Sequence, residues 1–350
     1  MTQNLYDAHR QWHTRPPDER FADLESLQDH TSRLKAASQE QVTELVDIHL
    51  DVTDRLGIAL NGHEEPALLT NWSFNQLCTS IGAPARYLRT LPPRTVIECM
   101  RWGLGERDAG AKLLYRNGGS DKTVAAFTGP NYGRIWDNDV VASLKEAVAG
   151  TGWKLPPGHD NEPTGLYASD RDMFAFLVND ESPVEVGNAK LSRGFFVWNS
   201  ETGAATFGLT TFLYNHVCGN GVVWGAEDLY ELKIVHRAKA LDRFHSDAIP
   251  ALNRFVESRT VGNTIRQVVD NAMRQKTGDN LDDALVSLSS KPFSKKEVID
   301  AWNQGMAEGE DPTTLWGMIQ GLTARARTYS HIDARVDLER RAGLLLRQAA

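Results

Sequence analysis

The spacing of hydrophobic residues changes twice along the chain. Up to about residue 110, apolar residues recur three or four positions apart, as on one face of a helix. From residue 111, short apolar runs alternate with clusters of turn-forming residues, which predicts β-hairpins. Helical spacing returns from Leu241. The pattern predicts an α+β protein with a helical N-terminal third, a central antiparallel sheet of hairpins packed on a helix, and a helical C-terminal third.

The first 37 residues are polar and contain prolines, which predicts an arm. We therefore expect three regions: a polar arm at 1–37, an α+β core at 38–240 and a helical C-terminal region at 241–350. Two capping boxes predict helix starts in the first third. They pair Ser38 with Gln41 and Ser73 with Gln76. Pro84 and Pro93 stand where helices can start, which predicts short helices at 84–90 and 93–102.

The middle of the chain predicts four hairpins and one helix. AKLLYRN and TVAAFTG flank the turn cluster GGSDK, GLYAS and MFAFLV flank DRD, and GFFVWN and ATFGL flank SETG. Asn220-Gly221 lies between HVC and VVW, and Asn-Gly favours a type I′ turn. Residues 137–149 predict an amphipathic helix, capped by Asp137 or Asn138, that buries Leu144.

The last hundred residues predict several helices. Pro250 interrupts the first of them. Ser294 with Glu297 forms a third capping box, and Asp311-Pro312 predicts a cap followed by proline at the first helical position. The tail from Thr313 to Gln348 predicts one or two long helices.

Composition adds information about class and partners. The chain has 350 residues, 41% of them hydrophobic and 24% charged, as in ordinary globular proteins. We expect no transmembrane helix, because no run of about 18 apolar residues exists, and the polar N-terminus does not predict a secretory signal. Three widely spaced cysteines predict a reduced cytoplasmic protein and no metal site. The net charge is −8, but residues 233–276 hold 9 basic and 4 acidic side chains.

Catalytic residues are unknown from the sequence. We find no phosphate-binding glycine motif and therefore expect no nucleotide cofactor, or any other. His216 and Cys218 alternate on a predicted strand, so a Cys–His pair is conceivable, although a buried cysteine beside a hydrogen-bonded histidine is the commoner arrangement. An enzyme acting on nucleic acid or nucleotides would use the hairpin-tip residues Asp170, Asp172 and Glu201 near His216.

Basic and aromatic residues are interleaved on the predicted hairpins, which is typical of proteins that bind single-stranded nucleic acid. Cations follow the phosphates there, while exposed aromatics stack on bases. The candidate phosphate-binding residues are Lys112, Arg116, Lys122, Arg134, Arg193, Lys233, Arg237, Lys239 and Arg243. The candidate stacking residues are Tyr115, Tyr132 and Trp198. We expect Arg116, Arg134 and Arg193 to line one groove with Lys233 and Arg237. The alternative is that the aromatics are core and the cations pair with acids.

Several motifs carry a family resemblance. They are LTNWSFNQLC, APARYLRTLP, NYGRIWDNDVV, GLYASDRDMFAFL, RGFFVWNSETGAATFGLTTFLYNHVCGNGVVWG, LWGMIQGLTARA and SHID. Together they resemble the bacterial phage/plasmid-like protein family, known as domain of unknown function 932, from about Trp72 to His331. The chain departs from that pattern at Thr202, where many members have a hydrophobic residue.

The resemblance implies carriage on phages and plasmids, and hence the cytoplasm of a bacterial or phage-infected host cell. The order of strands and helices is similar to the core of Rad-fifty-two-type single-strand annealing proteins, which form rings. We therefore expect an accessory protein that binds or anneals single-stranded DNA as a homo-oligomer in recombination or replication, without a membrane partner. The alternatives are the nucleic-acid- or nucleotide-processing enzyme above and a non-enzymatic anti-defence or interaction protein.

Overall fold

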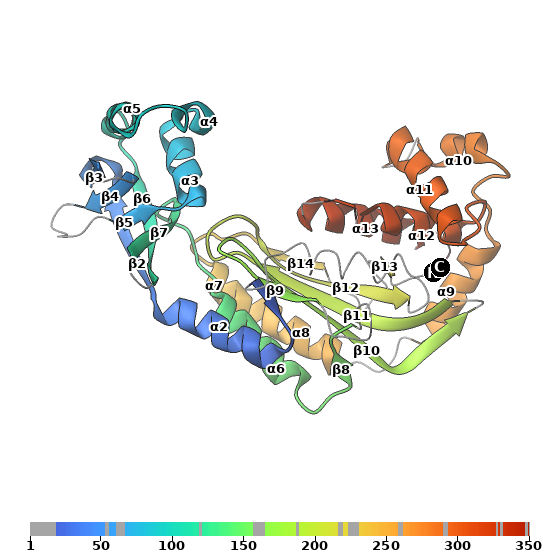
Figure 1. Cartoon of the computed structure of the whole chain (residues 1–350). Coiled ribbons are helices and arrows are strands. Elements are labelled where there is room, and N and C mark those ends of the chain that lie inside the picture. Colours follow the sequence, from blue (N-terminus) through green and yellow to red (C-terminus); the bar gives the residue numbers. More distant parts are fainter. Residues whose placement is uncertain are drawn as a thin grey trace.

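The structure is a computed structural model of the whole chain. It describes residues 19–52, 56–60, 67–118, 121–156, 165–186, 189–215, 220–222, 231–257, 262–289, 293–326, 328–329, 332–346 and 349. Two sheets and a group of C-terminal helices make up the described fold, with helices at both ends of the larger sheet (Figure 1). The predicted α+β class is confirmed.

The larger sheet is antiparallel and comes mostly from the middle of the chain. Its strands lie in the order β1, β9, β10, β11, β12 and β13, with β14 beside β12 and β8 beside β10. They are β1 (Arg20–Phe21), β8 (Trp153–Lys154), β9 (Leu166–Ala168), β10 (Met173–Val186), β11 (Ala189–Asn199), β12 (Phe207–Asn215), β13 (Asn220–Val222) and β14 (Glu231–Ile234). The hairpins predicted around DRD and around SETG are confirmed by the β9–β10 and β11–β12 pairings.

One face of this sheet packs against helices (Figure 1). They are α6 (Asp137–Val148), α7 (Ala240–Arg243), the π-helical turn η4 (Phe244–Ala248) and α8 (Ile249–Glu257). The predicted helix at 137–149 is confirmed, and Leu144 is fully buried in the shared core. Because side chains alternate along a strand, Phe195 and Val197 of β11 point to this face.

The other face of the larger sheet carries a layer of buried aromatic rings. It consists of Tyr167, Phe174, Phe176, Phe196, Trp198, Phe212 and Tyr214, with Val178. Two of the rings lie over glycines of the neighbouring strand. Trp198 pairs with Gly208 and Phe212 with Gly194, and a Cβ at Gly208 would lie 2.0 Å from Cζ2 of Trp198. The glycines therefore make room for the rings.

The smaller sheet has the order β2, β6, β7, β5, β4, β3, and only β5 and β7 pair in parallel. The strands are β2 (Ser38–Glu44), β3 (Ile48–Val52), β4 (Leu56–Leu60), β5 (Ala67–Leu69), β6 (Gly110–Gly118) and β7 (Asp121–Thr128). The 3-10 turn η2 (Leu45–Asp47) joins β2 to β3. Three helices accompany this sheet: α3 (Asn71–Ile81), α4 (Ala85–Leu88) and α5 (Pro93–Gly105). The first predicted hairpin and the helices after both prolines are confirmed.

Five helices from the end of the chain share a third core with Val184 and Leu191 of the larger sheet. They are α9 (Gly262–Arg274), α10 (Leu281–Leu288), α11 (Lys295–Ala307), α12 (Leu315–Ala326) and α13 (Ile332–Leu346). The capping box of α11 is confirmed, because Ser294 and Glu297 exchange both hydrogen bonds. Within the described residues, no helix is long and apolar enough to span a bilayer.

The predictions before residue 70 are wrong in two places. The helix expected from Ser38 is a strand, β2, which pairs with β6 from Ser38↔Arg116 to Glu44↔Gly110. The Ser38 hydroxyl instead donates to the carbonyl of Leu34. The expected polar arm contains the helix α2 (Leu24–Ala36), which is capped by Asp23 and contacts α6. Helical spacing was satisfied in the segment from Ser38, but pairing with a distant strand decided its structure.

Two helix starts are shifted. The helix expected from Ser73 begins at Asn71, because the Thr70 side chain accepts a hydrogen bond from the Ser73 backbone N–H. The helix expected after Asp311 begins at Leu315, because the Asp311 side chain accepts from the backbone N–H of Thr313 and closes a turn.

Two turn-forming residues have other roles than expected. Asn220 and Gly221 lie within β13, paired with Asn215 and Tyr214, and not in a turn between two strands. Residues 216–219 lie outside the described residues. Pro250 does not interrupt its helix. The helix runs from α7 through η4 into α8, and Pro250 is the second residue of α8.

Candidate functional site

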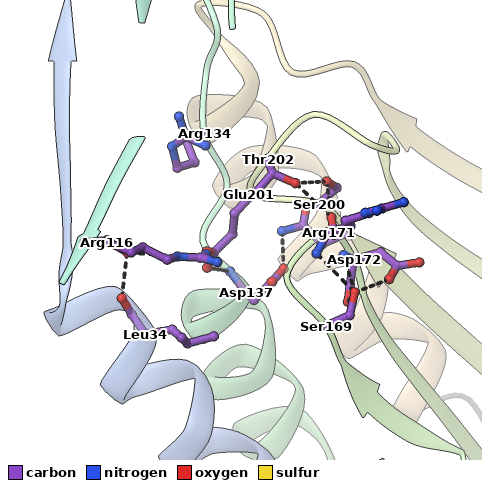
Figure 2. A network of polar contacts seen from close by, with 12 residues as sticks. Leu34, Arg116, Arg134, Asp137, Ser169, Arg171, Asp172, Ser200, Glu201 and Thr202 are labelled. Carbon is purple, nitrogen blue, oxygen red and sulfur yellow. Dashed lines mark hydrogen bonds and ion pairs between the residues drawn. The ribbon is translucent and has the colours of Figure 1, made fainter. Parts of the chain in front are cut away.

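The loop after β11 is the most buried polar segment of the described chain. Its four residues, Asn199, Ser200, Glu201 and Thr202, are almost inaccessible to solvent. Gly203 ends the segment with a φ of +83°, a backbone conformation that glycine adopts without strain. The segment lies where the larger sheet meets the smaller one, and Figure 2 shows Glu201 beside Arg116 and Asp137.

Glu201 is held by a cation and by a helix N-terminus. Its Oε2 accepts a hydrogen bond from the Arg116 guanidinium of β6, and the two form an ion pair. Its Oε1 accepts from the backbone N–H of Asp137, the first residue of α6, at 2.9 Å. The positive end of the helix dipole favours a carboxylate there. Glu201 therefore supplies the cap that the sequence assigned to Asp137 or Asn138.

The Asp137 carboxyl group lies beside this pair and is buried. Burial raises its pKa well above the usual value, and the Glu201 carboxylate raises it further. The Asn199 side chain partly opposes this effect by donating to Oδ1 of Asp137 at 2.7 Å. The same amide nitrogen donates to the carbonyl of Ile135 at 2.8 Å. The carboxyl group of Asp137 therefore holds its proton more strongly than an aspartate side chain in water does.

Backbone groups of the loop fasten the two sheets together. The Thr202 carbonyl accepts from Nε1 of Trp72 at 3.0 Å and from Nε2 of Gln76 at 2.7 Å, and both residues belong to α3. The Ser200 carbonyl accepts from the Tyr132 hydroxyl at 2.9 Å. We call Trp72, Gln76, Arg116, Tyr132, Asp137 and Asn199–Thr202 the junction cluster. Oδ1 of Asn199 is buried without a hydrogen-bond partner. The hydrogen bonds and the ion pair named above fix the two sheets relative to each other.

The expected enzyme site is not assembled by the described residues. Glu201 is bound to Arg116 and to α6, whereas Asp170 is exposed at its hairpin tip. Asp172 lies in the same tip, where its carboxylate accepts from the Ser169 hydroxyl at 2.7 Å. His216 and Cys218 lie outside the described residues. Among the residues that the structure describes, no group of three or more His, Cys, Asp or Glu side chains could hold a metal ion.

Four of the predicted phosphate-binding cations make contacts inside the molecule. Lys112 donates to the Tyr132 carbonyl at 2.7 Å, and Arg116 pairs with Glu201. Arg134 is buried between the rings of Tyr132 and Trp136, and its Nε donates to Glu40 at 2.7 Å. Arg193, on the larger sheet, donates to the Phe255 carbonyl at 2.7 Å and stacks on the Phe255 ring.

The prediction that five cations line one groove is therefore wrong. The buried side chain of Arg134 cannot line a surface, and Arg193 packs on α8 rather than beside Arg116. Stacking is likewise blocked at Trp198, which is 1% exposed, and at Tyr115, which is buried under Lys122. Tyr132 is half-buried and stacks on His236 with ring centroids 5.0 Å apart. The alternative that these aromatics are core describes them better.

Of the remaining five cations, Lys122 is half-buried over the Tyr115 ring. The other four are exposed and close together in the chain. Lys233 is on β14, Arg237 and Lys239 follow it, and Arg243 ends α7. We call residues 233–243 the basic segment. Arg243 is in an i,i+4 ion pair with Asp247 at 3.0 Å. Burial lowers the pKa of His236, within the segment, to about 4, so this histidine adds no charge at neutral pH.

Sequence reasoning missed most of the junction cluster. Gln76 was expected to cap a helix with Ser73, and no role was expected for Trp72. Asn199 and Thr202 were expected at a polar hairpin tip. The one available signal was the density of polar residues directly after Trp198, which does not distinguish a buried loop from an exposed one.

Comparison with other proteins leaves the family open. No protein family, no curated protein and no solved structure matches this chain.

Proposed function

We propose that this protein binds single-stranded nucleic acid as a homo-oligomer, as an accessory protein of phage or plasmid type in recombination or replication. The observation that carries the proposal is the exposed basic segment. Its 11 residues hold Lys233, Arg237, Lys239 and Arg243 against one acidic residue, Asp242, in a chain of net charge −8. Such segregation of charge is what binding to a polyanion requires of an acidic protein.

The buried cations and aromatics shape the kind of binding we expect. Trp198 and Tyr115 are buried, and the half-buried Tyr132 ring already stacks on His236, so none of the predicted aromatics presents a free ring face to bases. Contacts should therefore go mainly to phosphates, which makes binding tolerant of sequence and strongly dependent on salt. The family resemblance supports the same proposal through the motifs around NYGRIWD and RGFFVWNSE.

The test is fluorescence anisotropy of a labelled single-stranded oligonucleotide over a range of salt concentrations. Each lost phosphate contact should reduce the slope of log K against log salt by about 0.7, so Arg237→Ala with Lys239→Ala should reduce it by about 1.4. The matched control is Lys295→Ala with Lys296→Ala, which removes two exposed lysines from α11. Absence of binding at low salt would reject the proposal and favour the interaction protein.

A further inference from the structure

Helix α5 buries one side and exposes an unusually large aromatic residue on the other. Val96, Ile97, Met100 and Leu104 pack into the core of the smaller sheet. Trp102 lies on the opposite side and is 73% exposed. Figure 1 shows α5 at the outer end of this part of the molecule, away from the larger sheet. An exposed indole is costly in water and is enriched at interfaces.

The immediate neighbours of Trp102 argue against nucleic acid at this face. Residues four apart on a helix are neighbours, so Glu98 and Glu106 lie one turn to either side of the indole. Two carboxylates beside a base would repel its phosphates. Thr95 and Gly105 are small and lie on the same side, which leaves space for another helix to approach. This pattern fits a protein partner.

The charges on this face are complementary between two antiparallel copies of the helix. In two antiparallel copies of α5 that cross near residue 100, Arg94 of one helix lies opposite Glu106 of the other, and the pair occurs twice. Thr95 lies opposite Gly105 in the same register, so the small residues meet. Trp102 then packs against the turn that carries Glu98 and Cys99. An isologous contact requires this self-complementarity.

We propose that a second copy of this chain docks on α5, with the two helices antiparallel about a twofold axis. This rests on the homo-oligomer part of the proposed function and not on nucleic-acid binding. One pair of 13-residue helices buries an area at the small end of the range for specific interfaces. Association should therefore depend on protein concentration, with Trp102 as its main contributor.

Sedimentation over a range of protein concentrations tests the proposal. We expect Trp102→Glu to leave a folded monomer, since the side chain is outside the core. The control is Val286→Glu on α10, where the native valine is 79% exposed, and its dimerisation should equal that of the wild type. Arg94→Glu should weaken the dimer at least tenfold, and Arg94→Glu with Glu106→Arg should restore it.

Cysteine chemistry gives an independent readout. Cys99 is exposed and lies one residue from the proposed crossing point, whereas Cys78 is buried. Mild oxidation should join two chains through Cys99, and Cys99→Ser should abolish the crosslink. A wild-type monomer at every concentration, or a dimer that Trp102→Glu leaves intact, would overturn the proposal.

Nucleic acid is the competing occupant of this face. If Trp102→Glu lowered oligonucleotide binding without changing the sedimenting mass, the face would contact nucleic acid and the dimer would be rejected. If the wild type dimerised through α5 but bound no oligonucleotide, the proposed function would fail and the dimer would stand.

Discussion

Removing the Glu201 carboxylate should destabilise the junction between the two sheets. Glu201→Ala leaves the Arg116 guanidinium, whose side chain is 11% exposed, without its partner. It also leaves the backbone N–H of Asp137 without its acceptor. Breaking a buried ion pair by removing one partner costs about 3–5 kcal/mol, and an unsatisfied buried N–H costs about 1–3 kcal/mol.

The two costs should not simply add. Without the Glu201 charge, one cause of the raised pKa of Asp137 disappears, and an ionised Asp137 could partly compensate Arg116. We therefore expect Glu201→Ala to lower the free energy of unfolding by about 3–5 kcal/mol in total. Glu201→Gln keeps the shape and the acceptor for α6, so it should cost clearly less.

Urea unfolding followed by tryptophan fluorescence measures these changes. A double-mutant cycle with Arg116→Met separates the pair itself from the other contacts of each residue, because Met keeps most of the buried volume. A loss below about 1 kcal/mol for Glu201→Ala, the range of an exposed ion pair, would refute the buried junction.

Three further variants test other parts of the fold. Leu144→Ala should lower the free energy of unfolding by about 2–5 kcal/mol, because it opens a cavity between α6 and the larger sheet; a change near zero in urea unfolding would contradict that packing. Gly208→Ala should cost about 1–3 kcal/mol, since its Cβ would overlap the Trp198 ring, and an unchanged melting temperature would contradict the ring's position. The folded state binds the Asp137 proton more tightly than the unfolded state, because the pKa of Asp137 is raised from 3.8 on folding. The stability that this proton contributes is therefore lost as pH rises from about 3.8 through the folded-state pKa. Asp137→Asn should therefore flatten the dependence of thermal stability on pH above about pH 4; an unchanged profile would show that Asp137 does not cause it.

Local signals predicted much of the fold. The turn clusters DRD and SETG and the apolar face of residues 137–149 each specify their element within a dozen residues, and the structure has all three. The capping box at Ser294 succeeded for the same reason. These elements depend on contacts between residues that are close in sequence.

The failures depend on contacts between residues far apart in sequence. Ser38 and Gln41 satisfied a capping pattern, yet their segment pairs with β6, more than seventy residues away. Glu201 was expected at a polar hairpin tip, yet it pairs with Arg116 from the other sheet, 85 positions earlier. Burial of Arg134 between two aromatics removed it from the predicted groove in the same way. Neither periodicity nor turn chemistry carries information about such partners.

Photocrosslinking at low salt tests the central claim most directly. A single-stranded oligonucleotide would be crosslinked to the wild-type protein, and the modified peptides would be identified by mass spectrometry. The proposed function predicts that adducts concentrate in the basic segment, residues 233–243, and disappear as salt rises. Absence of adducts at low salt, or adducts confined to other parts of the chain, would contradict it.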